Sequence, residues 1–143
     1  MSIQQGICLS YKKEILEGVH SSTHDYYIAL YSSLTTLNKN TTSYIGTTNE
    51  IPESGTNYTT GGKALSGLYT NIVGDTAILS FSVNPQWEEA KFVTRGALIY
   101  NNSLPNKNAV AILDFGMDTV CDNVSLVIPF PTLGDDASLI KIT

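Results

Sequence analysis

The sequence predicts a mainly β protein: an antiparallel β-sandwich, jelly-roll or Ig-like, with one short N-terminal α-helix. Several short runs rich in β-branched and aromatic residues follow one another between turn residues. Only the first segment repeats its apolar residues at helical spacing. The length of 143 residues is typical of one domain. We therefore expect a single domain, with an N-terminal helix and connector over residues 1–24 and a sandwich over residues 25–143.

The predicted helix lies near the N-terminus, where four apolar residues recur three to four positions apart: Cys8, Tyr11, Ile15 and Val19. Ser10 or an earlier polar residue is the expected N-cap, and Gly18 is the expected end. A helix of about three turns is too short to be stable alone. Its apolar stripe must therefore pack on the sheet or on a neighbouring subunit, and the sequence leaves both open.

Six runs with strand character follow the helix, and they cover residues 26–31, 77–83, 92–100, 109–115, 124–130 and 138–142. Turn residues at 101–106 separate the third run from the fourth. Pro129 and Pro131 restrict the end of the fifth run to a sheet edge or an exit from the sheet. No alternation of strands with helices is present, so a doubly wound fold is not expected.

A long segment at about 34–67 is poor in aliphatic residues. An irregular segment of this length is unusual in a compact domain unless it is functional. We expect it to form a surface that becomes fully ordered against a partner, with Asn49, Glu50 and residues 55–62 as its specific parts. Tyr58 is the expected anchor, because a tyrosine combines a large contact area with one hydrogen-bonding group.

Charge and hydropathy exclude two classes of partner. Charged residues make up 15% of the chain, below the usual share of about 25%. The net charge is −5, and the only adjacent basic pair is Lys12 and Lys13, so no basic face for nucleic acid is expected. No apolar run approaches the roughly 20 residues of a membrane span. No signal peptide is recognisable either, so we expect synthesis in the cytoplasm without export by a signal.

The two histidines, His20 and His24, are candidate metal ligands together with Asp25. Gly18 and the Ser-Ser-Thr run between the histidines argue that the helix ends before them, so a solvated connecting loop is the favoured interpretation. Acid–base catalysis by carboxylates is also not expected at Glu88 and Glu89, since adjacent residues in a strand point to opposite faces. An exposed turn is favoured there.

The remaining chemical candidates also lack a recognised pattern. Three aspartates recur at every fourth position without matching a calcium loop: Asp114, Asp118 and Asp122. Cys8 and Cys121 are too few for a disulfide framework and are expected to be buried thiols. No phosphate-binding loop, dinucleotide motif or zinc-protease motif is present. We therefore expect no enzyme activity, no cofactor and no metal.

Two roles are considered for Trp87, the sole tryptophan. The favoured one is a core or interface residue near the start of a strand. In the other, Trp87 and some of the eight tyrosines form a platform that stacks on sugars.

An ordered series of motifs extends over nearly the whole chain. In the first half it comprises residues 10–20, 25–31, 41–44, 48–51 and 55–63. In the second half it comprises Trp87 and residues 97–101, 109–116 and 137–142. In this order and spacing the chain resembles a family of small structural proteins of tailed bacteriophages.

The resemblance implies a component of the virion, made in the host cytoplasm, and most plainly a capsid decoration or cement protein. Its implied partners are the major capsid protein or other virion proteins, with its own copies in a homo-oligomer or lattice. It supplies no catalytic residues. We predict six partner-binding residues: Tyr11, Ile15, Asn49, Glu50, Tyr58 and Trp87. Two alternatives stay open, namely an adaptor ring at the neck or tail, and a carbohydrate-binding module displayed on the particle.

Overall fold

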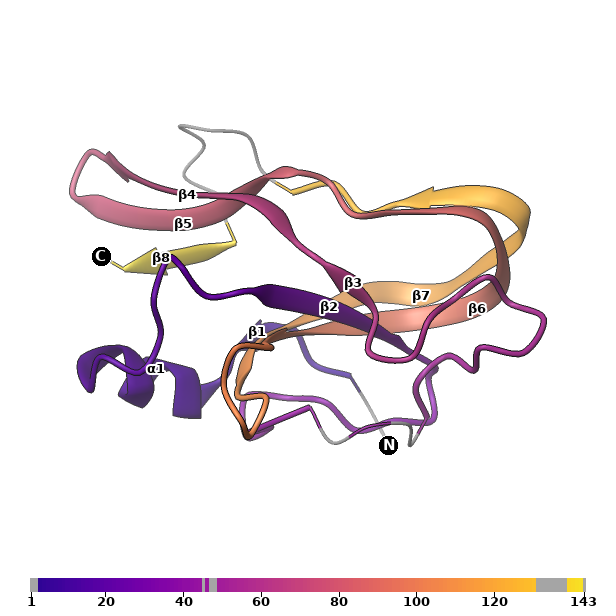
Figure 1. Cartoon of the computed structure of the whole chain (residues 1–143), viewed down its shortest axis with the longest axis horizontal. Helices are drawn as coiled ribbons and strands as arrows, with labels where there is room; N and C mark the ends of the chain where they lie inside the picture. The colour runs from indigo at the N-terminus through magenta and orange to yellow at the C-terminus, as the bar shows by residue number, and fades with distance from the viewer. Residues whose placement is uncertain (1–2, 45, 47–48, 131–138, 143) are drawn as a thin grey trace.

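Two antiparallel β-sheets and one short helix make up the computed structural model, which describes residues 3–44, 46, 49–130 and 139–142 (Figure 1). The larger sheet has the strand order β1-β7-β6-β2-β3, and the smaller sheet has the order β4-β5-β8. The elements are β1 (Gly6–Ile7), α1 (Leu9–Leu16), β2 (Tyr26–Tyr31), β3 (Lys63–Ala64), β4 (Ser66–Val73), β5 (Thr76–Val83), β6 (Gln86–Asn101), β7 (Ala109–Val127) and β8 (Ile140–Ile142). The predicted class, a β-sandwich with one short helix, is confirmed.

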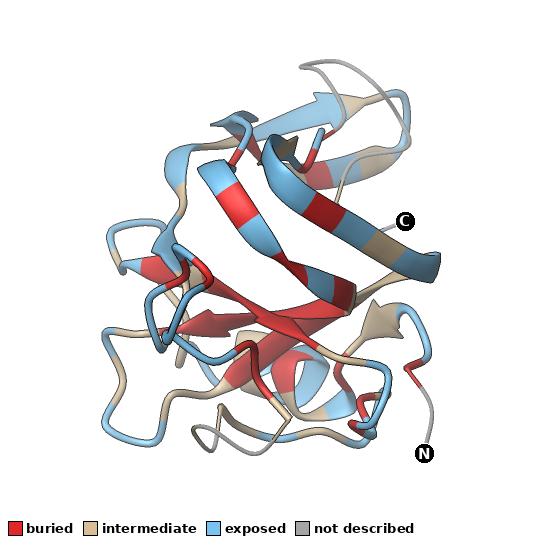
Figure 2. Ribbon diagram, turned by 90° about the vertical axis from the view of Figure 1, so that its right-hand side faces the viewer, coloured by how far each residue is buried: buried red, intermediate tan, exposed pale blue. Residues whose placement is uncertain are grey.

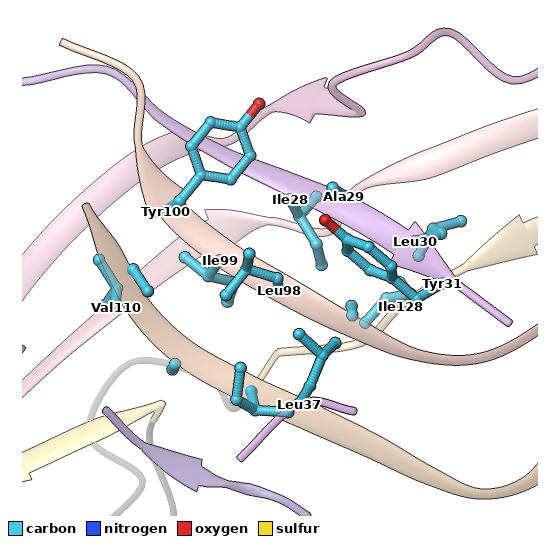
Figure 3. Packing of buried hydrophobic residues seen from close by; sticks show 14 of the residues in the cluster. Ile28, Ala29, Leu30, Tyr31, Leu37, Leu98, Ile99, Tyr100, Val110 and Ile128 are labelled. Carbon is cyan, nitrogen blue, oxygen red and sulfur yellow. The ribbon is translucent and has the colours of Figure 1, made fainter. Parts of the chain in front are cut away.

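Strand β2 lies in the middle of the core. Its run of aromatic and β-branched residues pairs with β6 from Tyr26 opposite Asn101 to Tyr31 opposite Gly96. Ile28 is fully buried on this strand, and it packs in the same apolar layer as Ile99 of β6 (Figure 3). Burial of each such side chain contributes about 1.5–3 kcal/mol. Figure 2 shows the consequence, since buried residues concentrate on the strands around β2, whereas β4 has no buried residue and β5 has both buried and exposed ones.

The β6–β7 hairpin bends from one layer of the sandwich into the other. Figure 1 shows the ribbon turning back on itself at the end opposite to α1. The register shifts at the bend, because Thr94 pairs with Thr119 while Gly96 pairs with Asp114, which leaves extra residues on β7. Such bulges increase bending and twist. Gly116 has a φ of 81° within this bulge, a conformation that favours glycine.

This hairpin corrects one prediction. The sequence predicts separate strands at 109–115 and 124–130, whereas β7 is continuous from Ala109 to Val127. The polar residues between the two runs resemble a turn, yet their backbone continues to pair with β6. Glu88 and Glu89 lie in β6 and are exposed, and Glu89 has a φ of 51° at a register shift. The predicted turn is therefore a bulge within a strand.

Helix α1 is shorter than expected. It begins after Cys8, which makes no side-chain cap, and Ser10 lies inside the helix and not at its start. Gly18 follows with a φ of 74°, and the N–H of Val19 bonds back to the carbonyl of Glu14. This left-handed glycine ends the helix as predicted. No helix among the described residues has the length and apolar character that a membrane crossing requires.

The long irregular segment folds against the chain's own sheet. The N–H of Ile51 donates to the carbonyl of Leu30, and the N–H of Ser32 donates to the carbonyl of Asn49. The segment therefore covers an edge of β2 that would otherwise be open. This corrects the expectation that the whole segment awaits a partner for its order. Thr48 and Ser138, which the sequence analysis placed in the binding segment and in the last strand, lie outside the described residues.

Candidate functional site

The carboxylate of Glu50 is buried and accepts three hydrogen bonds. The hydroxyl of Tyr44 donates to Oε1 at 2.7 Å, and the hydroxyl of Tyr58 donates to Oε2 at 2.6 Å. The backbone N–H of Gly61 also donates to Oε2, at 2.8 Å. A buried carboxylate needs such donors because it has lost its hydration. Glu50 thus joins three separate parts of the long segment.

The tyrosines of this cluster connect it to the larger sheet. The Tyr58 hydroxyl accepts the N–H of Leu30 at 3.0 Å, and the Tyr100 hydroxyl donates to the carbonyl of Gly61 at 2.6 Å. The rings of Tyr44 and Tyr100 stack with centroids 4.5 Å apart. Burial, and then the hydrogen bond to Glu50, hold the pKa of both Tyr44 and Tyr58 well above the usual value for tyrosine. These hydroxyls are therefore neutral donors at neutral pH.

These contacts correct the predicted role of Tyr58 as the anchor that binds a partner. Its side chain is only 3% exposed, and its hydroxyl is bonded on both sides within the chain. Glu50 is likewise committed to internal donors. Both residues stabilise the segment and offer no free polar atom to a partner.

Asn49 differs from its neighbour in being partly exposed. Its φ of 62° places it in the left-handed region, which asparagine tolerates better than most residues. Its side-chain amide donates to the carbonyl of Leu34 at 3.2 Å. Asn49 therefore shapes the turn that covers β2, and part of its surface is open to solvent.

Trp87 is a core residue, as the favoured interpretation expected. Its side chain is 3% exposed and stacks on the ring of Tyr58 with centroids 6.3 Å apart. The ammonium of Lys63 lies 5.7 Å from the centroid of the indole ring. The alternative in which Trp87 stacks on sugars is contradicted, because the ring faces are covered by the chain itself.

Tyr11 and Ile15, the two predicted residues of the helix, lie on one wall of a surface cleft of about 620 Å³. The opposite wall is the face of the small sheet that bears Ile72, Leu79 and Ile142. Tyr11 is buried, whereas Ile15 is partly exposed. The apolar stripe of α1 therefore packs only in part against the sheet, and an apolar opening remains between them.

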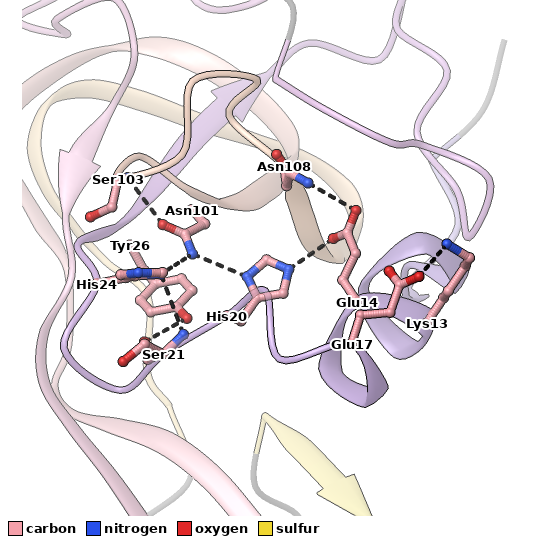
Figure 4. A network of polar contacts seen from close by, with 10 residues as sticks. All are labelled: Lys13, Glu14, Glu17, His20, Ser21, His24, Tyr26, Asn101, Ser103 and Asn108. Atoms are coloured by element: carbon pink, nitrogen blue, oxygen red, sulfur yellow. Dashed lines mark hydrogen bonds and ion pairs between the residues drawn. The ribbon is translucent and has the colours of Figure 1, made fainter.

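A hydrogen-bond network lies beside this cleft and is centred on Asn101 (Figure 4). The Asn101 amide donates to Nδ1 of His20 at 3.0 Å and to Nδ1 of His24 at 2.9 Å. Nε2 of His20 lies 2.8 Å from Oε1 of Glu14, whose other oxygen accepts from Asn108 at 2.8 Å. The network therefore joins α1, the connector and the end of β6.

The orientation of the Asn101 amide determines the tautomers of both histidines. Its oxygen accepts the N–H of Ser103 at 3.0 Å, so its nitrogen must be the group that faces the two rings. Because an amide nitrogen is a donor only, Nδ1 of each histidine must be the unprotonated acceptor. His20 then donates from Nε2 to Glu14. Both rings are held as neutral Nε2–H tautomers in this arrangement.

This network corrects the expectation of a solvated connecting loop around the histidines. The side chain of His20 is 3% exposed, and its ring lies 4.6 Å from the ring of Tyr11. No local pattern in the sequence points to Asn101, which is 81 positions away from His20. The backbone N–H of Asp25, the third candidate ligand beside the histidines, donates to the hydroxyl of Ser103 at 2.8 Å.

The described residues contain no group of three or more His, Cys, Asp or Glu side chains placed to hold a metal ion. Cys8 is fully buried, and burial, followed by the charge of Glu14, raises the pKa of its thiol to about 11. A thiol of this kind is a poor nucleophile at neutral pH. Cys121 is also buried, and burial raises its pKa as well.

Exposed apolar side chains gather outside the cleft as well. Val93 of β6 and Val120 of β7 are paired across the bent hairpin, and both are exposed, as is Met117 at the bulge. A second groove, of about 570 Å³, is lined by residues of β1 and β7 together with Phe130. Singly exposed apolar residues are normal on protein surfaces, so those of the hairpin are not evidence for a partner.

The comparisons with known proteins add no relatives. No protein-family model, no curated protein and no solved structure matches this chain. The fold and the site define the chain as a two-sheet antiparallel β-sandwich with a partly open apolar cleft between α1 and the smaller sheet.

Proposed function

We propose that this chain is a non-catalytic structural protein of a bacteriophage virion, and most specifically a decoration protein that binds the capsid lattice formed by the major capsid protein. The resemblance of its ordered motifs to small structural proteins of tailed bacteriophages supports the virion assignment. The fold is compatible with this role, because a rigid sandwich can hold a binding surface at a fixed distance from a shell.

The observation that carries the binding role is the apolar cleft between α1 and the smaller sheet. Ile15 lines it from the helix and Ile142 from β8, and Ile142 is 55% exposed. Apolar side chains that remain accessible in a small monomer gain free energy when a partner covers them, at about 25 cal/mol per Å² of apolar surface. A protruding apolar segment of a capsid subunit is the proposed occupant.

The proposed mechanism is thermodynamic. A protein that binds only the assembled shell shifts the equilibrium towards assembly, and the gain grows with its free concentration relative to its dissociation constant. Many copies on one lattice act together, so each contact can be modest. The chain's dense internal hydrogen bonds around Glu50 would keep the sandwich rigid while the cleft is engaged.

The test is the copy number of this chain per purified particle, measured by quantitative mass spectrometry against the major capsid protein. A copy number comparable with that of the capsid protein is expected. A small ring-like number would instead favour the alternative of a neck or tail adaptor, and absence from the particle would overturn the virion assignment.

A variant then tests the cleft. Ile15→Lys places a charge on the cleft wall, where Ile15 is only partly buried, so the sandwich should fold while occupancy on heads falls at least tenfold. Val120→Lys is the matched control, because Val120 is exposed on the β6–β7 hairpin, away from the residues that line the cleft. Equal occupancy of both variants would contradict the cleft as the docking site.

A further inference from the structure

Strand β4 forms the edge of the smaller sheet along its whole length. It pairs with β5 from Ser66 opposite Val83 to Val73 opposite Thr76, and its other side pairs with no strand in the described part of the chain. A sheet edge offers a row of N–H and C=O groups that can pair with another strand. An edge of eight residues is therefore a candidate interaction surface.

The register shows which residues have backbone groups that point outward. Val73 and Thr76 close a two-residue turn, so they form a hydrogen-bonded pair, and the pairs Asn71–Ile78 and Tyr69–Ser80 follow at alternate positions. The intervening residues then direct their N–H and C=O groups away from β5. These residues are Leu68, Thr70 and Ile72.

Natural proteins protect long edges with charged residues, prolines or bulges. β4 contains no charged residue and no proline, since its sequence is Ser-Gly-Leu-Tyr-Thr-Asn-Ile-Val. Its register with β5 is continuous from Leu68 to Val73, so no bulge interrupts this part of the strand. The other terminal strands of the sheets are only two or three residues long: β1, β3 and β8. The open part of β7 carries Asp118 and Asp122 and is interrupted by bulges. β4 is thus the long unprotected edge among the described strands.

We propose that β4 is a homodimer interface, in which β4 of a second copy of this chain pairs with it antiparallel about a two-fold axis at Thr70. In this register Thr70 faces its own copy, and Leu68 of each chain faces Ile72 of the other. All three are residues with outward groups, so each pair exchanges both of its N–H···O bonds. The edge is self-complementary, as a two-fold interface requires.

Side chains and charges favour this occupant. Ile72 is 74% exposed in the single chain, and the pairing brings it against Leu68 of the other copy. Each copy carries a net charge of −5, so a self-association surface must lack carboxylates, and β4 does. The nearest carboxylate along the sequence is that of Asp75 in the turn, five positions from the axis. At about 3.4 Å per residue, the two Asp75 carboxylates are roughly 30 Å apart and are screened from each other.

The inference concerns the isolated chain and does not depend on the decoration role. The experiment is sedimentation velocity of the purified full-length chain over a wide range of concentration. A reversible monomer–dimer equilibrium is expected. A wild-type chain that remains monomeric up to millimolar concentration would overturn the proposal, while the capsid-binding role would be unaffected.

Two variants locate the interface. Thr70→Pro removes an outward N–H without touching the bonds from its neighbours to β5, and Ile72→Lys puts a charge into the apolar pair. Each should weaken dimerisation at least tenfold while far-ultraviolet circular dichroism stays unchanged. Val120→Lys is the matched control, because Val120 is 70% exposed but lies on β7. A dimer that survives both β4 variants would overturn the proposed surface.

A disulfide crosslink between two copies tests the register, and this test remains informative even if Thr70→Pro fails to fold. Residues facing each other in a hydrogen-bonded pair have Cα atoms about 5.5 Å apart, within the range for a disulfide. Thr70→Cys should therefore form a covalent dimer under mild oxidation, and Val120→Cys should not. The native Cys8 and Cys121 are buried and do not compete. Equal crosslinking of the two variants would contradict the pairing at Thr70.

Discussion

The hydroxyl of Tyr58 donates a hydrogen bond of 2.6 Å to the carboxylate of Glu50 in the protein interior. Through this bond, a segment with few aliphatic residues acquires a fixed structure. The same hydroxyl accepts the N–H of Leu30, so it connects the segment to the central strand β2. The polar centre of the segment thus takes the place that an apolar core has elsewhere.

Removing the Tyr58 hydroxyl should destabilise the fold. Tyr58→Phe leaves the Glu50 carboxylate with one donor fewer and the N–H of Leu30 without its acceptor. Buried unpaired groups of this kind cost about 1–3 kcal/mol each, so the loss at these two groups should lower the free energy of unfolding by about 2–6 kcal/mol in urea denaturation. Thr59→Ala is the matched control in the same loop, because Thr59 is exposed, and a change within about 0.5 kcal/mol is expected. An equal effect of the two substitutions would contradict the role of the cluster.

Gly62 and Gly55 should respond differently to alanine. Both have positive φ values, 86° and 72°, so alanine is strained by about 1 kcal/mol at either position. A Cβ at Gly62 would also collide with the backbone carbonyl of Ile28, whereas a Cβ at Gly55 would meet nothing within 4 Å. Gly62→Ala should therefore cost about 1–3 kcal/mol more than Gly55→Ala, which is the usual cost of overpacking. Thermal unfolding of the two variants measures the difference.

Alkaline pH should destabilise the protein through its buried tyrosines. Burial raises the pKa of Tyr26 to about 12, while an unfolded tyrosine has a pKa of about 10. The neutral form is favoured in the fold, so this contribution is complete below pH 10 and is lost as the pH rises towards 12. Burial also raises the pKa of Tyr44 and of Tyr58, so their contributions to stability are likewise lost as the pH rises.

The measurement is the free energy of unfolding against pH, with tyrosinate absorbance recorded in parallel. Tyr26→Phe should lose about 1 kcal/mol at neutral pH, because Tyr26 donates to the carbonyl of Ser21 at 2.9 Å, and should reduce the alkaline slope. A slope identical to that of the wild-type chain would show that Tyr26 makes no such contribution.

The histidine tautomers can be observed directly. Long-range proton–nitrogen NMR should show Nε2–H tautomers for His20 and His24 at neutral pH, because Asn101 donates to Nδ1 of both. Asn101→Ala removes both donors in a fully buried position and should cost about 2–4 kcal/mol. An Nδ1–H tautomer of His20 in the wild-type chain would contradict the assigned amide orientation.

Trp87 gives a simple spectroscopic test of its burial. As the sole tryptophan, 3% exposed, it should emit at short wavelength and resist acrylamide quenching. A panel of glycans should leave this emission unchanged, because Trp87 is buried and its ring stacks on Tyr58. A glycan-dependent shift that Trp87→Phe abolishes would restore the carbohydrate-binding alternative.

The sequence by itself determined the fold class, and it did so through local pattern. The run at 26–31 became β2 with the predicted bounds, and Gly18 ended the helix where expected. The spacing of apolar residues, every second position in a strand or every third to fourth in a helix, indicates which face of an element is apolar. Glycine indicates a left-handed turn. Both signals are local, so they can be recognised without the tertiary structure. Strand β4 was missed because its most apolar residues, Leu68 and Ile72, lie four positions apart and it is largely exposed.

Only the tertiary structure decided which polar residues are internal. Tyr58 bonds to Leu30, 28 positions away, and His20 bonds to Asn101, 81 positions away. The donors to Glu50 lie 6, 8 and 11 positions away in an irregular segment, and no local pattern records any of these pairings. The same holds for partner-binding residues, since Tyr11 and Ile15 line a cleft while Tyr58 and Trp87 are buried. Exposure depends on which surfaces the fold brings together, because a large side chain that packs in a core and one that awaits a partner have the same sequence signature.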